Sequence, residues 1–183
     1  MSAAALSGCV IVSGMPGAGT STVTRLAAKL LPRAAQIKAD TVNEMILSGR
    51  VWFGAEPKVE AGRQEQLCNR NLCSLAGNFM DYGFTVFMDQ LVETQAQLAF
   101  IVDRLAPRPV RLVTLAPGAA VCEHRNATRA ADESWQFGGY HQLDADMRRE
   151  LRGVGWWFDT STLTPQETAD QLVREVAARC IAG

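Results

Sequence analysis

Residues 14–22 read GMPGAGTST and directly follow an apolar run, CVIVS, at residues 9–13. Their spacing matches the phosphate-binding pattern G-x-x-x-x-G-K-[ST] at every fixed position except the lysine, where Thr20 stands. Glycines let a backbone turn its N–H groups inward around an anion, and a helix beginning near Gly19 would aim its unpaired N–H groups at that anion. A glycine-rich turn without a ligand is the alternative. The strand, the spacing and the hydroxyl of Ser21, at the Mg²⁺-binding position of the pattern, together favour phosphate binding.

Two aspartates are candidates for chemistry because each follows a predicted strand. Asp89 ends the apolar run FTVFMD. A carboxylate at the end of an apolar strand is typical of sites where it faces Mg²⁺ or the water shell of that ion. Asp is also a common turn residue, but beside the glycine loop we favour the metal-binding interpretation. Asp40 follows AAQIKA, and there it could orient an acceptor hydroxyl and accept its proton, or it could cap the following helix. The spacing leaves both interpretations of Asp40 open.

Arg125 and Arg129 lie four residues apart in CEHRNATRAADE, so a helix would place both on one face, where they could bind phosphate oxygens. Arginine pairs of this kind usually belong to a solvated helix face. Here a polar segment with Gly138 and Gly139 follows, which is typical of a movable flap. We therefore expect a lid at about residues 125–140.

Short apolar runs alternate with longer amphipathic segments along the chain. We expect strands at residues 9–13, 34–39, 84–89, 109–116 and 155–161. We expect helices at about residues 20–31, 41–49, 59–82, 94–105, 119–128 and 143–151, with a last helix from Pro165. Strands separated by helices indicate a parallel α/β sheet covered on both faces. Ligands bind beyond the carboxyl ends of such strands, where the glycine loop, the two aspartates and the segment 159–161 are expected to meet.

Side chains in these elements give a candidate core. On the long helix, an apolar stripe is expected to face inward: Leu72, Leu75, Phe79 and Met80. Trp156 and Trp157 are expected in the core, whereas Trp52, Phe53 and Trp135 lie in loops, where they could line a pocket. The cysteines are odd in number, show no C-x-x-C spacing and are expected to be buried and reduced: Cys9, Cys68, Cys73, Cys122 and Cys180.

The composition is that of one globular domain. The chain has 183 residues, of which 48% are hydrophobic and 20% charged, with a formal net charge of −1. A balanced charge gives no reason to expect nucleic acid as a partner. The beginning of the chain lacks a basic region followed by a long apolar run, so we expect no signal peptide and no membrane anchor. These features predict a cytoplasmic protein.

In this order, the motifs resemble those of the P-loop small-molecule kinases related to the nucleoside-monophosphate kinases. The segments that carry the resemblance are VIVSGMPGAGTST, IKADTVNEMI, FTVFMDQ, the spacing R-x-x-x-R of Arg125 and Arg129, and FDTSTLTPQETADQLV. They extend from residue 9 to about residue 177. The chloramphenicol phosphotransferase-like and zeta-toxin-like branches of the family are the most similar.

The resemblance implies a three-layer fold over residues 1–183, with a five-stranded parallel sheet of order 2-3-1-4-5 and a small lid. It implies transfer of the γ-phosphate of ATP, with Mg²⁺, to a hydroxyl of an antibiotic, nucleoside or sugar-like small molecule. For the nucleotide it implies Gly14, Pro16, Gly17, Ala18, Gly19, Thr20, Ser21, Thr22, Thr160 and Ser161. For the metal it implies Ser21 and Asp89, and for catalysis Asp40, Arg125 and Arg129.

Thr20 departs from the family pattern because threonine supplies no positive charge to the β- and γ-phosphates. Losing one such preorganised contact costs about 3–4 kcal/mol in the transition state, or a factor of 10² to 10³ in rate. A nucleotide-binding protein with impaired catalysis is therefore the alternative to an enzyme, and a domain without a ligand is a third, weaker one. Lys38 lies on the same side of its strand as Asp40, but an edge strand would place it far from the phosphates.

Overall fold

The computed structural model describes residues 6–128 and 139–179. These residues form a sheet of five parallel strands in the order β2-β3-β1-β4-β5, which confirms the predicted α/β class and strand order. The strands are β1 (Cys9–Ser13), β2 (Ala34–Lys38), β3 (Thr85–Asp89), β4 (Val110–Leu115) and β5 (Trp156–Phe158). The fifth strand is shorter than predicted, because the carboxylate of Asp159 accepts a hydrogen bond of 2.9 Å from the backbone N–H of Ser161 and turns the chain.

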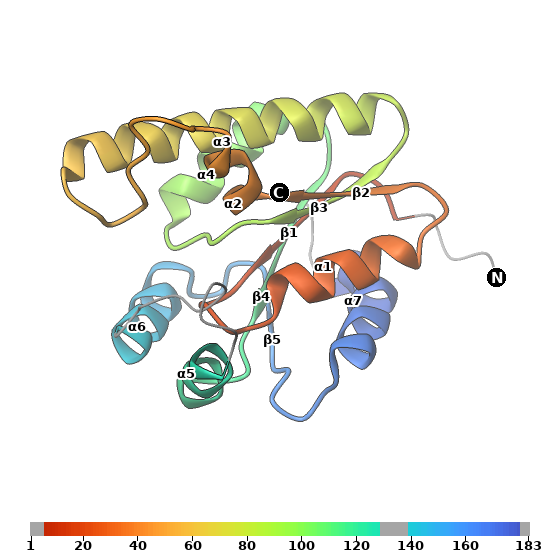
Figure 1. Ribbon diagram of the computed structural model, residues 1–183. Coiled ribbons are helices and arrows are strands. Elements are labelled where there is room, and N and C mark those ends of the chain that lie inside the picture. The colour runs from red at the N-terminus through yellow and green to blue at the C-terminus, as the bar shows by residue number, and fades with distance from the viewer. Residues whose placement is uncertain (1–5, 129–138, 180–183) are drawn as a thin grey trace.

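Helices cover both faces of the sheet. They are α1 (Thr20–Lys29), α2 (Ala39–Glu44), α3 (Lys58–Asp81), α4 (Gln95–Leu105), α5 (Ala119–Ala127), α6 (Tyr140–Glu150) and α7 (Pro165–Arg179). Figure 1 shows α3 and α4 on one face and α1 and α7 on the other, so that the chain forms three layers. The second helix ends at Glu44 rather than near residue 49, and Met45 and Leu47 beyond it are exposed, so a longer helix would bury little further apolar surface there.

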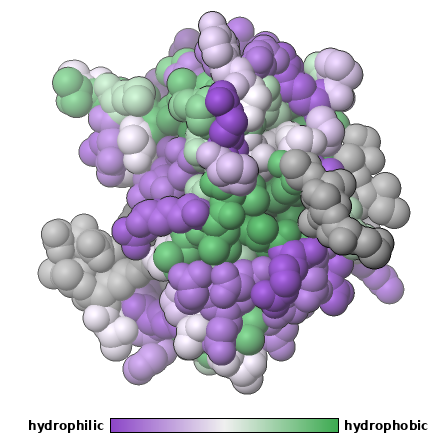
Figure 2. Space-filling model, turned by 90° about the vertical axis from the view of Figure 1, so that its right-hand side faces the viewer, coloured by the Kyte–Doolittle hydropathy of each residue, from purple (hydrophilic) through white to green (hydrophobic). Residues whose placement is uncertain are grey.

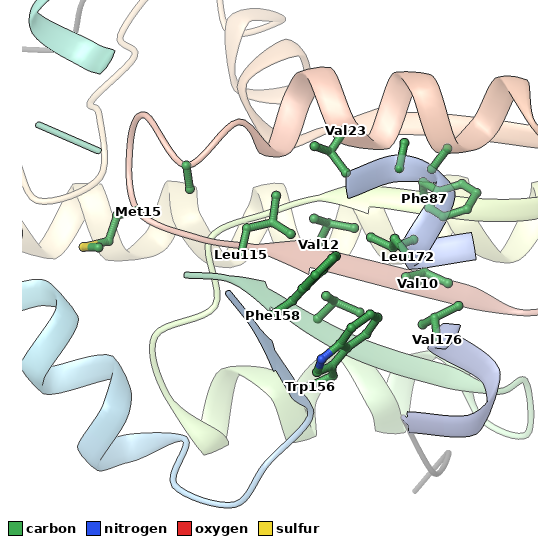
Figure 3. Close-up of a cluster of buried hydrophobic side chains, with 14 of the residues drawn as sticks. Val10, Val12, Met15, Val23, Phe87, Leu115, Trp156, Phe158, Leu172 and Val176 are labelled. Carbon is green, nitrogen blue, oxygen red and sulfur yellow. The ribbon is translucent and has the colours of Figure 1, made fainter. Parts of the chain in front are cut away.

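Alternating residues of β1 supply the core on both faces of the sheet, as the period of a strand requires. Val10 and Val12 pack with α1 and α7 in the cluster shown in Figure 3, whereas Cys9 and Ile11 pack with α3 and α4. In the first cluster the ring of Trp156 stacks on that of another residue of β5, Phe158, with centroids 4.3 Å apart. The expected core position of Trp156 is confirmed.

The inward stripe predicted for α3 is partly wrong. Leu72 is fully buried, but Leu75 and Phe79 are exposed by 36% and 38%. The buried face of the helix instead consists mostly of small side chains: Ala61, Cys68, Asn69, Leu72, Cys73 and Ala76. Phe79 packs edge-on against Phe84, with ring centroids 6.0 Å apart, at the end of the helix. Short side chains let α3 lie close to the sheet, so the larger ones turn outward.

Leu72→Ala is expected to lower the free energy of unfolding by about 2–5 kcal/mol, because the fully buried side chain leaves a cavity. Leu75→Ala on the same helix is the matched control and should cost about 1 kcal/mol or less, since its side chain is partly in water. Urea denaturation of both variants measures the difference. Equal losses would contradict the assignment of the buried face.

The strands begin at one side of the molecule, which Figure 2 shows. Hydrophobic residues gather at the centre of this face and hydrophilic residues surround them. The candidate functional residues lie at the other side, where the strands end (Figure 1). Over residues 6–128 and 139–179, no helix combines the length and the apolar character that crossing a membrane requires.

Candidate active site

A cleft of about 1080 Å³ opens beyond the carboxyl ends of β1, β2 and β3. It brings together candidate residues that are far apart in the sequence. Those that line it are Gly14, Pro16, Gly17, Gly19, Thr20, Ser21, Thr22, Asp40 and Asp89. Ala18 belongs to the same loop but is buried behind it. A single cavity therefore joins the glycine loop to both aspartates.

The glycine loop has the shape of an open cradle that ends at α1. Gly17 has a φ of +88°, and a Cβ there would lie 2.2 Å from the carbonyl oxygen of Cys122 in α5. Gly19 has a φ of +95° as the N-cap of α1, yet a Cβ there would meet no atom within 4 Å. One glycine thus packs against α5, and the other borders empty space at the amino end of a helix, where an anion is stabilised.

Gly17→Ala is expected to destabilise the protein more than Gly19→Ala. Each alanine would have to adopt a positive φ, at a cost of about 1–2 kcal/mol. At position 17 the added methyl group would also overlap the backbone of Cys122, at a further cost of about 1–3 kcal/mol. Chemical denaturation of the two variants measures the difference, and Gly19→Ala serves as the control for backbone strain alone. Similar losses would mean that the loop moves away from α5 freely.

Ser21 and Asp89 meet at the start of α1. The hydroxyl of Ser21 donates a hydrogen bond to Oδ2 of Asp89, which ends β3. A hydroxyl and a carboxylate are oxygen ligands of the kind that Mg²⁺ prefers, and this ion keeps several waters and phosphate oxygens in its shell. No group of three or more His, Cys, Asp or Glu in the described residues could hold a metal by itself. The pair therefore fits Mg²⁺ that arrives with a phosphate ligand.

Gln36 of β2 fixes the first turn of α1 against the sheet. Its Nε2 donates to the carbonyl oxygen of Ser21 at 2.8 Å and to Oγ1 of Thr24 at 2.7 Å. Gln36 therefore faces α1, and Lys38, two residues further along the strand, shares that face. Although β2 is the edge strand, Lys38 lines the cleft. Its position in the register lies opposite Asp89.

Asp40 lies in the first turn of α2 and not at the capping position, which Lys38 occupies without a side-chain cap. The helix-cap interpretation of Asp40 is therefore wrong. Its carboxylate forms no hydrogen bond with any described residue and faces the cleft. The side chain is exposed at the cleft surface, and its partial burial there raises its pKa; the negative charges of Asp89 and Glu44 raise it further, and Lys38 lowers it. A carboxylate with a perturbed pKa in a cleft is a candidate functional group.

The predicted lid and nucleotide-base residues that the structure describes do not line this cleft. Arg125 lies in the last turn of α5 and does not line it, although the next residue, Asn126, does. Arg129, together with most of the predicted lid, falls outside the described residues. Thr160 is buried and Ser161 exposed after β5, and neither lines the cleft.

Sequence reasoning missed the polar residues of the opposite wall. Glu65 of α3, Gln90 after β3 and Glu93 in the same loop all line the cleft. Trp52 and Phe53 also line it, as the sequence predicted, whereas Trp135 lies outside the described residues. In the helix, the sequence pattern indicated only the apolar stripe and its packing in the core. In the loop, polar residues show no periodicity that would single them out. Closeness to Asp89 in the sequence was the available signal for Gln90 and Glu93.

The chain has the fold of the P-loop kinases. A sugar kinase from Janibacter sp. HTCC2649 superposes with a TM-score of 0.69 over 94% of this chain and 96% of its own, at 15% identity. The APS kinase of Mycobacterium tuberculosis, in complex with AMPPNP and APS, has a TM-score of 0.70 over 92% and 96%, at 18% identity. The tunicamycin resistance protein of Deinococcus radiodurans has a TM-score of 0.66 over 97% and 100%, at 17% identity.

Sequence comparison adds nothing to this. No protein-family model matches the chain, and no curated protein is similar to it in sequence. At such low identities the likeness to solved structures establishes the fold alone. The resemblance to the chloramphenicol phosphotransferase-like and zeta-toxin-like branches stays a prediction.

Proposed function

We propose that this protein is a phosphotransferase that moves the γ-phosphate of ATP to a hydroxyl group of a small molecule. The observation that carries the proposal is the hydrogen-bonded pair of Ser21 and Asp89 beside the open glycine cradle, with Asp40 in the same cleft. The names of the similar structures support it, since they include a sugar kinase and an APS kinase with AMPPNP and APS bound.

The glycine loop would hold the phosphates through its backbone N–H groups and the amino end of α1. Ser21 and Asp89 would hold Mg²⁺, which neutralises charge that develops on the phosphates. Asp40 would accept the proton of the acceptor hydroxyl while the acceptor oxygen forms a bond to the γ-phosphorus and the bond to ADP breaks. The adenine of ATP would lie beyond β5, near Thr160 and Ser161. Arg125 and Arg129 would approach the phosphates from the lid.

Lys38 is the residue that we propose in place of the missing lysine. It lies on the α1 face of β2 and lines the cleft, and it forms no ion pair within residues 6–128 and 139–179. The backbone of Lys38 in β2 is two strand spacings, or about 10 Å, from that of β1, which leads into the glycine loop. The flexible side chain of lysine spans much of that distance. A cation here would act on the γ-phosphate and on the proton-accepting carboxylate together.

Incubating the purified chain with MgATP and a panel of sugars, nucleosides and hydroxylated antibiotics tests the proposal. Release of ADP that depends on the acceptor, and a phosphorylated product seen by phosphorus NMR, are the expected results. A reaction without an acceptor serves as the control for simple hydrolysis. Tight binding of MgATP with no transfer to any acceptor would instead support the alternative, a nucleotide-binding protein that Thr20 leaves catalytically impaired.

A further inference from the structure

The wall of the cleft opposite the glycine loop is acidic. Glu65 projects from α3, Glu93 from the loop after β3, and Glu44 from the end of α2. Together with the two aspartates, five carboxylates line the cleft: Asp40, Glu44, Glu65, Asp89 and Glu93. Among the described lining residues, the positively charged ones are Arg25 and Lys38. This excess of negative charge is unexpected in a cleft proposed to bind a nucleoside triphosphate, because that ligand is also an anion and like charges repel.

Glu65 and Glu93 lie close enough for their charges to interact, and both contact Gln97. Gln97 of α4 connects them, because its Nε2 donates to Oε1 of Glu65 at 3.4 Å and its Oε1 accepts from the backbone N–H of Glu93 at 3.0 Å. In the part of the chain that the structure describes, neither glutamate forms an ion pair. Burial raises the pKa of both, and the charge of Glu65 raises that of Glu93 further.

Gln90 gives an independent indication that this wall binds a ligand. It lines the cleft and is 8% exposed, and its Nε2 donates to Oδ1 of Asn69 at 3.2 Å and to the carbonyl oxygen of Leu91 at 3.1 Å. Its Oε1 is buried and has no donor among the described residues. A buried acceptor without a donor costs free energy, and a ligand that brings an N–H or O–H group would recover it.

In residues 6–128 and 139–179, no group of three or more His, Cys, Asp or Glu could hold a metal ion without further ligands. The carboxylates of this wall and the amide oxygen of Gln90 are acceptors for a ligand that carries several donors and a positive charge. An alkylammonium group next to hydroxyl groups has both properties.

We propose that the acceptor of this site is a hydroxylated amine, whose ammonium group binds between Glu65 and Glu93 while a neighbouring hydroxyl lies at Asp40. This inference rests on the proposed function and names its substrate class. The positive charge of the ammonium group is attracted both by the carboxylates of the acidic wall and by the phosphates of the bound nucleotide. A neutral polyol gains only the hydrogen bonds, and an acceptor with a carboxylate or phosphate is repelled.

Three six-carbon polyols that differ in one terminal group test the charge preference: glucamine (ammonium), sorbitol (hydroxyl) and gluconate (carboxylate). Their binding is measured by calorimetry near neutral pH, where the amine is protonated, with and without a non-hydrolysable ATP analogue and Mg²⁺. Glucamine is expected to bind at least about tenfold more tightly than sorbitol, and gluconate more weakly than sorbitol. Glu65→Gln and Glu93→Gln should each abolish most of the preference, whereas Glu60→Gln, on α3 but outside the cleft, should leave it unchanged.

The outcomes separate the two proposals. Normal binding of the ATP analogue with no preference for glucamine, including no binding of any of the three polyols, would overturn the amine class and leave the phosphotransferase. Failure to bind the ATP analogue would overturn the proposed phosphotransferase. In that case a glucamine preference that depends on Glu65 and Glu93 would still identify the acidic wall as an amine site.

Discussion

Asp40→Asn is expected to lower kcat for phosphate transfer by about 10²- to 10⁴-fold, the usual contribution of a positioned general base. Asparagine keeps the size of the side chain but accepts no proton, and Asp40 forms no hydrogen bond with a described residue that the change would break. Binding of MgATP should therefore change little. Asp103→Asn, exposed on α4 and outside the cleft, is the matched control. A kcat within threefold of the unchanged protein would remove Asp40 from the reaction.

The raised pKa of Asp40 has a consequence for pH dependence. Activity requires the ionised carboxylate, so it should fall on acidification at a pH above the 3.8 of an ordinary aspartate. The folded protein binds this proton more tightly than the unfolded chain, so the contribution of Asp40 to the free energy of unfolding decreases as the pH rises from 3.8 through the raised pKa. Above that window Asp40→Asn should melt at the same temperature as the unchanged protein or higher, which calorimetry measures. A lower melting temperature would show that the ionised carboxylate stabilises the fold.

Lys38→Met is expected to lower kcat by about 10²- to 10³-fold, because it removes the cation that we assign to the γ-phosphate. The variant also takes away a charge that lowers the pKa of Asp40, so the assay belongs at about pH 8.5, where that carboxylate stays ionised. Methionine preserves most of the unbranched stem. Lys29→Met, exposed at the end of α1, is the control for loss of a lysine from the surface.

Thr20→Lys completes the test of Lys38. If Lys38 already serves the phosphates, the substitution alone should raise kcat less than tenfold, but in the Lys38→Met background it should restore much of the lost rate. Such non-additivity is expected when two groups perform one task. A gain of about a hundredfold in the unchanged background would instead favour the impaired nucleotide-binding protein. An unchanged kcat in Lys38→Met would contradict the role of Lys38 directly.

Local patterns were sufficient for most helices and strands and for the parallel α/β class, whereas the strand order was an expectation from the family resemblance. The apolar run before Gly14, the helix period after it and the alternation of apolar runs with amphipathic segments predicted elements whose bounds mostly agree within a few residues. Errors arose where a neighbour decides the outcome. Phe79 turns outward to pack on Phe84, and the strand at β5 stops where Asp159 bonds to the N–H of Ser161. No periodicity in a single segment contains such contacts.

The sequence by itself determined the α/β class and the candidate phosphate loop, because strand and helix periods and the spacing of Gly14, Gly19 and Ser21 are local properties. Only the tertiary structure decided what shares the cleft with that loop. It brings Lys38 on the edge strand to the α1 face, and it places Glu65 opposite, although the sequence separates these residues widely. The physical reason is that charges interact through space. Which carboxylates and cations lie near one another depends on strand order and helix packing, and no single segment of the sequence contains that information.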